Sequence, residues 1–503
     1  MKKASWFEII AARGWNLLNE GKPFTPIFVV GTFLLFHIPD WSTSSFWSTM
    51  ALSMLTILPL LVIYYVYDYP LMLRNYLWIP FVVSLILWNQ LNIGLSLFAL
   101  GLYFFFTIFF WGTFYYHLRI GTSWLNFTRF WKLVLKNSDS TSGNAQEQIP
   151  KFLLLLFLWD RQYSLLQQGY TIGELDWIRL LGFGGFVFLF SWLLHHYLFD
   201  WKPKEREGYT KQFFTESSQA LTKKVIMIIV DGARKDRFAE ANTPFLDQLR
   251  LNGTEYTQME TVYPARTVVC FSSIFTGTYP KEHGIKSNMV WKLGIKVESV
   301  FDSLRKVGKK GRLLGIAHLI DAMADDVESV TAVMNNDVAD RNIIERAKKI
   351  MSEQNPDLLA VQLISTDQTG HSRGSLYEEY KQKIEEADHL IEEFVHWLED
   401  KGMMEDTTII IAADHGQSDG IGGHGHLDEG ERFVPFFMHG PNIAKGKQVD
   451  KRHSLISVAP TIAYLLGAPF PEHSRGPVLM EAIKELKGNI NEEAESNRIS
   501  TGT

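Results

Sequence analysis

The stretch KKVIMIIVDGARKDRF, residues 223–238, decides the fold of the second half of the chain. Its apolar, β-branched run from Val225 to Val230 is too short for a buried helix and suits a central strand. Asp231 and Gly232 follow at once. Ligands of an open parallel sheet bind at the carboxyl ends of its strands, so Asp231 is a candidate site residue by position. An Asp-Gly pair at this place is also a common turn.

The same arrangement occurs twice more downstream. The run LLAVQLI at 358–364 is followed by Asp367, with His371 four residues later, and the run TIIIAA is followed by Asp414 and His415. Three buried strands therefore bring carboxylates to one edge of the predicted sheet. Taken singly, each of these residues could be a turn aspartate, a helix cap or a surface histidine.

Histidines complete a possible metal site. If a helix begins beyond Asp367, that residue and His371 share one face of it and can reach a common ion. The glycine-rich segment 422–426 offers His424 and His426. Mixed Asp and His ligands suit Zn or Mn better than Ca. Two groups of ligands predict two ions about 3.5 to 4 Å apart, the spacing that serves displacement at phosphorus.

Together these residues resemble the catalytic domain of the alkaline phosphatase superfamily, and within it the type I phosphodiesterase and nucleotide pyrophosphatase branch. The likeness covers roughly half of the chain, in the family's order. The motifs that carry it are VDG at Asp231, YPARTVVCFSSIFTGTYPKEHGI around Thr267, TDQTGH at Asp367 and His371, ADHG at Asp414 and His415, and GGHGH at His424.

The resemblance implies two sets of ligands, one for each ion: Asp231, Asp414 and His415, and Asp367, His371 and His424. It also makes Thr267 a metal ligand and the nucleophile: a metal ionises its hydroxyl, which then attacks phosphorus to give a phosphothreonine intermediate. A threonine hydroxyl is a poor nucleophile until a base or cation lowers its pKa. His424 is followed by Gly425, and this His-Gly pair resembles the family's pattern, so His424 is favoured over His426 as the ligand. The C-x-P-x-R motif of sulfatases is lacking, and Cys270 is expected to be a small buried filler.

Residues 1–200 are predicted to be a membrane region. Most of its charge-free apolar runs approach the roughly 20 residues that a helix needs to cross a bilayer. The five runs are Phe24 to Pro39, Phe46 to Tyr67, Leu77 to Leu91, Ile93 to Tyr116, and Leu180 to Phe199. Asn89 and Asn92 are expected to mark a tight turn, because one unbroken helix from Leu77 to Tyr116 would be too long for a single crossing.

The distribution of basic residues predicts an orientation. They precede the first span, Arg74 lies between the second and third, and several lie in the loop 117–179, whereas the turn after the first span has none. With five spans, the positive-inside rule puts the N-terminus in the cytoplasm and the catalytic domain outside it, in an extracytoplasmic position. Basic residues just after the last span, at 202–211, disagree with this orientation.

The loop 117–179 is predicted to contain interfacial segments. Trp124 to Lys136 has the pattern of a basic amphipathic helix lying in the membrane interface, and Lys151 to Trp159 of a second such segment. Between them, Asn137 to Gln148 is polar and is expected to be mobile. The alternative for these segments is a helix that packs against the membrane bundle.

The domain organisation follows from these patterns. An α-helical membrane bundle of about five spans, 1–200, precedes a linker, 201–222, and an α/β domain, 223–486, with a mostly parallel central sheet. The polar tail 487–503 is expected to be disordered. The chain has 503 residues, a net charge of -6 and one cysteine, so no disulfide framework is possible and nucleic acid is not an expected partner.

The layout is similar to that of lipoteichoic acid synthases and ethanolamine phosphate transferases. This implies a multi-pass membrane enzyme, a metal-dependent phosphodiesterase or phosphotransferase that acts on a phosphodiester-linked headgroup of a lipid or surface glycan. The expected partners are the lipid bilayer and that substrate, and no oligomeric state is specified. One alternative is a membrane-anchored nucleotide pyrophosphatase. The other is a catalytically silent membrane scaffold.

Overall fold

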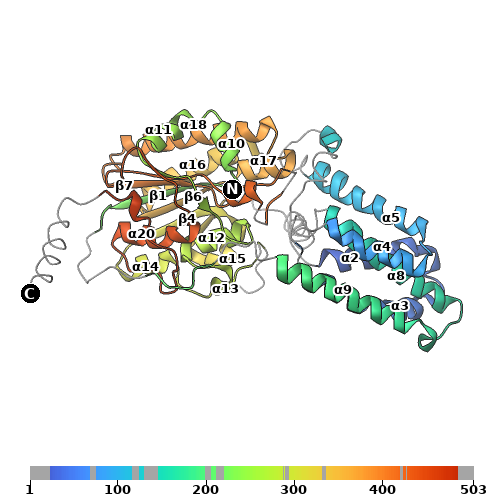
Figure 1. The fold of residues 1–503 in the computed structure, drawn as a ribbon. Helices are drawn as coiled ribbons and strands as arrows, with labels where there is room; N and C mark the ends of the chain where they lie inside the picture. Colours follow the sequence, from blue (N-terminus) through green and yellow to red (C-terminus); the bar gives the residue numbers. More distant parts are fainter. Residues whose placement is uncertain are drawn as a thin grey trace, which may run out of the picture.

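A computed structural model describes most of the chain. The residues described are 23–67, 69, 75–115, 124–129, 145–198, 205–210, 220–286, 288, 294–330, 336–419, 423–425 and 428–484. The predicted tail 487–503, most of the predicted interfacial helix Trp124 to Lys136 and His426 therefore lie outside the described residues. Figure 1 shows a bundle of helices from the first part of the chain and an α/β domain from residue 224 onward.

An eight-stranded sheet forms the middle of the α/β domain, in the order β5-β4-β6-β1-β7-β8-β2-β9. At its centre, β1 (Lys224–Val230) pairs in parallel with β6 (Leu358–Leu363) and with β7 (Thr407–Ala412). This arrangement confirms the predicted parallel centre and puts three carboxyl ends side by side. The other strands are β2 (Thr254–Tyr256), β4 (Gly311–Ile316), β5 (Val327–Val330), β8 (Phe436–His439) and β9 (Lys447–Val449), and β3 (Met259–Glu260) pairs with β10 (His453–Ser454).

Helices cover both faces of this sheet, as Figure 1 shows. On one face lie α10 (Lys235–Glu240), α11 (Pro244–Leu251), α16 (Asn336–Glu353), α17 (Ser365–Arg373) and α18 (Glu378–Asp400). On the other lie α12 (Thr267–Thr276), α13 (Pro280–His283), α14 (Val300–Lys306), α15 (Ile320–Met323) and α20 (Val458–Leu466). The short α19 (Glu429–Arg432) precedes β8. The domain is thus a three-layer α/β sandwich with its apolar core on both sides of the sheet.

All five apolar runs of the N-terminal region form helices. They are α2 (Phe24–Phe36), α3 (Phe46–Val66), α4 (Trp78–Trp88), α5 (Ile93–Phe104), which a π-helix (Phe105–Tyr115) extends, and α9 (Trp177–Leu198). Two described helices, Phe46–Val66 and Trp177–His195, are long and apolar enough to cross a membrane, with mean hydropathy of 2.0 and 1.7. The other three are shorter, so the number of spans stays a prediction.

The turn between α4 and α5 has the predicted place. Asn89 adopts a left-handed conformation with a φ of 45° and ends α4. Asn92 begins α5, because its side-chain oxygen accepts a hydrogen bond from the backbone N–H of Leu95 at 3.0 Å. A single helix from Leu77 to Tyr116 is therefore excluded.

A sixth helix, α8 (Ala145–Gln167), runs through the middle of the bundle. Its side chains from Lys151 to Trp159 are all buried, so the prediction that this segment lies in the membrane interface is wrong and the alternative of a packed helix is right. The expected mobile segment also ends earlier than predicted. Gln148 is buried and accepts a hydrogen bond from Thr25 Oγ1 at 2.7 Å.

The helix α8 also changes the topology that the sequence predicted. Among the described residues, six helices, and not five, lie between Pro23 and the α/β domain, so an odd number of crossings no longer follows from the described helices. The prediction of an extracytoplasmic catalytic domain depended on that odd number. The number of helices in the structure therefore no longer supports an extracytoplasmic position.

Candidate metal centre

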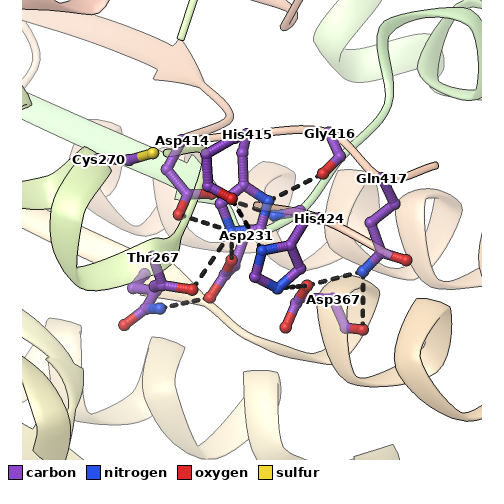
Figure 2. Close-up of polar contacts among 12 residues, drawn as sticks. Asp231, Thr267, Cys270, Asp367, Asp414, His415, Gly416, Gln417 and His424 are labelled. Carbon is purple, nitrogen blue, oxygen red and sulfur yellow. Dashed lines mark hydrogen bonds and ion pairs between the residues drawn. The ribbon is translucent and has the colours of Figure 1, made fainter. Parts of the chain in front are cut away.

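The first group of candidate ligands lies at the carboxyl ends of β1 and β7. Asp231 directly follows β1, and Asp414 and His415 follow β7, which is the parallel neighbour of β1. His415 Nε2 lies 3.6 Å from Asp231 Oδ1 and 3.4 Å from Asp414 Oδ2. All three side chains are buried, and Figure 2 shows them gathered beside Thr267. The adjacent strands thus bring this predicted set to one point.

The second group lies beside the first, at the end of β6. Asp367 and His371 are one turn apart on α17, as predicted, and His371 Nε2 is 3.2 Å from Asp367 Oδ2. His424 comes from the described segment 423–425, and its Nε2 lies 3.1 Å from His371 Nε2 and 3.8 Å from Asp367 Oδ1. Within each group, the possible ligand atoms lie within 4.8 Å of one another. All six predicted ligands therefore meet in the predicted two groups.

Backbone carbonyls orient two of the histidines. His415 Nδ1 lies 2.9 Å from the carbonyl oxygen of Gly416, and His424 Nδ1 lies 2.9 Å from that of Ala265. Because a carbonyl only accepts, each Nδ1 carries the proton, and each Nε2 turns a lone pair toward the cluster. The two imidazole rings stack with their centroids 4.0 Å apart, so the two groups adjoin.

Unpaired oxygens show that the first group fits a cation. Asp231 Oδ1 and Asp414 Oδ2 are buried and have no hydrogen-bond partner among the residues that the structure describes. Burial and the charge of Asp414 raise the pKa of Asp231, and burial also raises the pKa of Asp414. Buried, unpaired carboxylate oxygens are unfavourable unless a positive charge accompanies them. Asp231, Asp414 and His415 would hold such a cation.

The second group has the opposite electrostatic balance. Burial alone would raise the pKa of Asp367, but the neighbouring His371, His424 and His415 outweigh it and hold this pKa well below its usual range. Burial and His415 lower the pKa of His424, which keeps its imidazole neutral. A carboxylate together with imidazole nitrogens is a donor set that suits Zn or Mn. Asp367, His371 and His424 would hold the second cation.

Thr267 lies next to the first group of ligands. It is the first residue of α12, it is buried, and its Oγ1 lies 3.3 Å from His415 Nε2. The N-terminus of a helix presents backbone N–H groups and a positive dipole end, which favour an anion such as phosphate. The predicted nucleophile is therefore placed between the candidate ligands and a natural position for a phosphate group.

Asn288 is a site residue that sequence reasoning missed. Its Oδ1 accepts a hydrogen bond from the backbone N–H of Val268 at 2.8 Å, so its side-chain amide lies next to Thr267. An amide at this place can donate to a phosphate oxygen. The sequence held one indication of this role: Asn288 lies three residues beyond the end of the motif YPARTVVCFSSIFTGTYPKEHGI.

Two glutamines support the carboxylates from behind and were also missed. Gln362 Nε2 donates to Asp231 Oδ2 at 2.5 Å, and Gln417 Nε2 donates to Asp367 Oδ1 at 2.7 Å. Gln362 had a readable signal, since it is the single polar residue in the fully buried strand β6. Each glutamine fixes which oxygen of its carboxylate remains for an ion.

Two glycines make room for this arrangement. Gly232 has a φ of 67°, and a Cβ there would lie 2.6 Å from Asp367 Oδ1, so the Asp-Gly turn after β1 needs glycine for both conformation and space. A Cβ on Gly370 would lie 1.8 Å from Gln417 Oε1. The spacing of the TDQTGH motif therefore has a packing reason in addition to its ligands.

Replacing Gln417 with methionine is expected to weaken binding of one metal ion by roughly 10- to 100-fold, the usual effect of losing a residue that orients a ligand. Methionine keeps the length of the side chain but does not donate to Asp367. Titration of the metal-free protein with Zn²⁺ against a competing chelator measures the change. Gln448→Met, in the exposed strand β9, is the matched control, and an unaltered affinity in Gln417→Met would contradict the supporting role.

Cys270 has the structural role that was predicted. It is fully buried in α12, and its Sγ lies 3.2 Å from Thr261 Oγ1. Burial, followed by the charge of Asp414, raises the pKa of its thiol well above the usual value. The thiol is therefore neutral, and Thr267 is the hydroxyl or thiol group that faces the candidate ligands in Figure 2.

Comparisons with known proteins identify relatives of the α/β domain. A family model described as Sulfatase matches residues 223–468. The chain is similar to the human GPI ethanolamine phosphate transferase 3, catalytic subunit, with 30% identity over 152 residues, which is 30% of this chain and 13% of the transferase. It is also similar to ectonucleotide pyrophosphatase/phosphodiesterase family member 1 of Rattus norvegicus, with 26% identity over 200 residues, 35% of this chain and 22% of the relative.

The chain thus spans 13% and 22% of the length of these two relatives. A solved structure of murine ectonucleotide pyrophosphatase/phosphodiesterase 5 aligns with 50% of this chain and 97% of its own, with a TM-score of 0.44 and 15% identity.

Proposed function

Because residues 223–468 form a domain of the sulfatase and alkaline phosphatase superfamily, we propose that this chain is a membrane-anchored phosphodiesterase or phosphotransferase with two divalent ions, Zn or Mn. Its substrate is a phosphodiester-linked headgroup of a lipid or surface glycan. The observation that carries the proposal is the pair of adjoining groups of three ligands, with the Thr267 hydroxyl 3.3 Å from His415 of the first group. A cation would pair with the buried oxygens Asp231 Oδ1 and Asp414 Oδ2.

Thr267 performs the chemical step. Its Oγ attacks phosphorus and the bond from phosphorus to the leaving oxygen breaks. The leaving group takes up the proton lost by the Thr267 hydroxyl and departs as an alcohol, and the phosphothreonine that forms keeps the second ester of the substrate. Divalent ions held by the two groups of ligands would supply the charge that ionises the hydroxyl and neutralises the oxygens of the phosphoryl group. The start of α12 and the Asn288 amide orient those oxygens. Water or an acceptor alcohol then attacks the phosphothreonine, which decides between hydrolysis and transfer.

The surface of the helical bundle supports membrane anchoring. Many of its large apolar side chains face outward, and Leu55, Ile86 and Ile178 are 62%, 75% and 88% exposed. Its polar contacts lie inside, such as the hydrogen bond from Tyr69 to Ser191 at 2.8 Å. An apolar exterior around polar interior contacts suits lipid and is unfavourable in water. We infer that the bundle is a multi-pass membrane region.

A short tether supports a substrate at the membrane surface. Residues 205–210 are docked on the α/β domain, where the Arg206 N–H donates to the Tyr279 hydroxyl at 3.1 Å and Thr210 Oγ1 donates to the Gly476 carbonyl at 2.8 Å. Only residues 199–204 separate this docked segment from the end of α9. Fully extended, they span at most about 25 Å. The domain is therefore held close to the bundle, where headgroups are concentrated.

A second function is favoured by one observation, the likeness to ectonucleotide pyrophosphatases. In that case the substrate is a soluble nucleotide, and the bundle serves only as an anchor. A catalytically silent scaffold is the third possibility, and it predicts a chain that binds no metal and turns over nothing. The complete set of six ligand side chains, five of them buried, favours the two enzymatic functions over it.

Turnover of a substrate panel separates these functions. The full chain in detergent, loaded with Zn²⁺ or Mn²⁺, is expected to release headgroups from phospholipids in mixed micelles, or to transfer them to an acceptor alcohol, and to act poorly on nucleotides. Mass spectrometry of both products measures the result, with Thr267→Ala protein as the blank. Turnover of nucleotides alone would replace the lipid function with the pyrophosphatase function.

A further inference from the structure

The direction of each bundle helix can be followed from its contacts with the central helix α8. The helix α2 runs parallel to α8, because residues near the two starts meet and residues near the two ends meet. These pairs are Thr25 with Gln148 through a hydrogen bond of 2.7 Å, Phe28 with Phe152 at 4.8 Å between ring centroids, Phe33 with Trp159 at 3.9 Å and His37 with Tyr163 at 5.0 Å.

The helices α3 and α5 run in the opposite direction. At the end of α8, the ring of Phe46 meets Tyr163 at 6.0 Å and Asn92 Nδ2 lies 3.2 Å from Asp160 Oδ1. At the start of α8, the ring of Tyr103 meets Phe152 at 5.4 Å and Lys151 Nζ lies 5.6 Å from the ring of Tyr64. The turn at Asn89 then requires α4 to run parallel to α8.

The helix α9 returns the chain to the end of the bundle where α2 begins. Near its start, the ring of Phe183 meets Trp88 at 5.4 Å, at the end of α4. Near its last turns, Ser191 Oγ accepts a hydrogen bond from Tyr69 at 2.8 Å, just beyond the end of α3. We call the end of the bundle that contains Thr25 and Ser191 the domain-side end, and Figure 1 shows α9 leading from the bundle to the α/β domain.

Basic residues are concentrated in the segments that flank the domain-side end. These segments are 1–23, 67–77, 116–144 and 199–211, and they contain four, one, four and four Lys or Arg residues. The segments at the opposite end, 37–45, 89–92 and 168–176, contain none. Two arginines, Arg161 and Arg179, lie on the helices near that opposite end. The basic residues at 202–211 disagreed with a five-span topology. In the six-helix topology they are on the same side as the other three basic segments.

We infer that the catalytic domain lies on the cytoplasmic side of the membrane, together with the N-terminus. The inference rests on the proposed membrane anchoring. Loops rich in Lys and Arg stay in the cytoplasm, and every such segment flanks the domain-side end. The substrate is then a phosphodiester-linked headgroup of the cytoplasmic leaflet, or of a lipid-linked precursor made there, and a glycan on the outer surface is out of reach.

Site-directed cysteine labelling tests the topology, and the chain suits it. Its one cysteine, Cys270, is fully buried, so the parent protein provides an unlabelled background. Ser44→Cys reports on the opposite end of the bundle and Ser352→Cys on the α/β domain, and both serines are exposed. Ser42→Cys and Lys401→Cys repeat the comparison at second exposed positions in case one variant folds poorly. The probe is a membrane-impermeant maleimide added to spheroplasts that express the full chain.

We expect Ser44→Cys to label in intact spheroplasts and Ser352→Cys to label only after lysis. Labelling of Ser352→Cys in intact spheroplasts would overturn the inference, whether or not Ser44→Cys labels with it. Labelling of neither variant before lysis would also overturn it, because the bundle would then not cross the membrane.

The labelling pattern does not depend on turnover, so it separates this inference from the proposed chemistry. Thr267→Ala introduced into each cysteine variant is expected to leave the labelling unchanged. An inactive protein with the expected labelling would contradict the proposed function alone, and an active protein with the reverse labelling would contradict the topology alone.

Discussion

Replacing Thr267 with alanine is expected to lower turnover by about 10³-fold or more, the loss typical of removing a nucleophile that forms a covalent intermediate. The Thr267 hydroxyl lies 3.3 Å from His415 Nε2, and the only described cysteine thiol nearby, that of Cys270, is buried and neutral. The Cys270 thiol can therefore not replace it. Initial rates with the substrate that the panel identifies measure the loss.

Two observations make this test specific. Thr267→Ser retains the hydroxyl and is expected to remain active. Brief incubation of Thr267→Ser or of the parent with substrate, followed by acid quenching, should leave the phosphoryl group of the substrate on that residue. Metal content should be equal in all three proteins, because the six candidate ligands are intact. Parent-like turnover in Thr267→Ala would refute the covalent mechanism.

The second large effect is expected from Asp414→Asn, which should remove about one equivalent of metal per chain and abolish measurable turnover. Asp414 is fully buried at the end of β7, and its Oδ2 has no hydrogen-bond partner among the residues described. An amide keeps the shape but loses the charge that a divalent ion needs. Elemental analysis of the purified proteins counts the ions.

The control comes from the other end of the same strand. Asp406→Asn removes only a surface ion pair with Lys223, at 2.5 Å between an exposed ammonium and a half-exposed carboxylate, and should change neither metal content nor turnover. His371→Gln should remove the other equivalent of metal. If Asp414→Asn bound two ions, the assignment of the first group would be wrong.

The same variant has a second, opposite expectation in metal-free protein. Burial raises the pKa of Asp414 above its unfolded value, so the folded protein gains a proton as the pH falls, and its stability decreases as the pH rises through this range. Wherever the carboxylate is ionised, it therefore destabilises the metal-free fold. Metal-free Asp414→Asn should melt at a higher temperature than the metal-free parent, and a lower melting temperature would contradict the electrostatic account.

Local patterns were sufficient for the centre of the sheet and for its ligands. The three apolar runs before Asp231, Asp367 and Asp414 could only be buried strands, and parallel strands bring their carboxyl ends together. Helix boundaries followed local chemistry as well. The helix α14 begins at Val300, because Ser299 and Asp302 cap it reciprocally, with the Ser299 N–H donating to Asp302 Oδ2 at 2.8 Å.

The sequence could not show which carboxylate each supporting glutamine contacts, because the two partners are distant in the chain. Gln417 is 50 residues from Asp367, and Gln362 is 131 residues from Asp231. Nothing in either local sequence names that partner. Their function becomes visible only when β1, β6 and β7 lie side by side.

The position of α8 was left open for a related reason. A local sequence pattern does not show whether a charged side chain is buried, and α8 contains four charged residues. In the bundle, Lys151 pairs with Glu147 and lies 4.5 Å from the ring of Tyr69. Pairing makes burial tolerable, and residue spacing alone does not reveal it.

By itself, the sequence determined the three central strands, the helix that joins Asp367 to His371, and the six ligand types with their threonine, because these depend on short-range periodicity and on motifs of a few residues. Only the tertiary structure decided which oxygens stay unpaired for an ion, which glutamines orient the carboxylates, and that the described helix α8 packs inside the bundle. Those features depend on contacts between residues tens to hundreds of positions apart, where burial and pairing outweigh local preference.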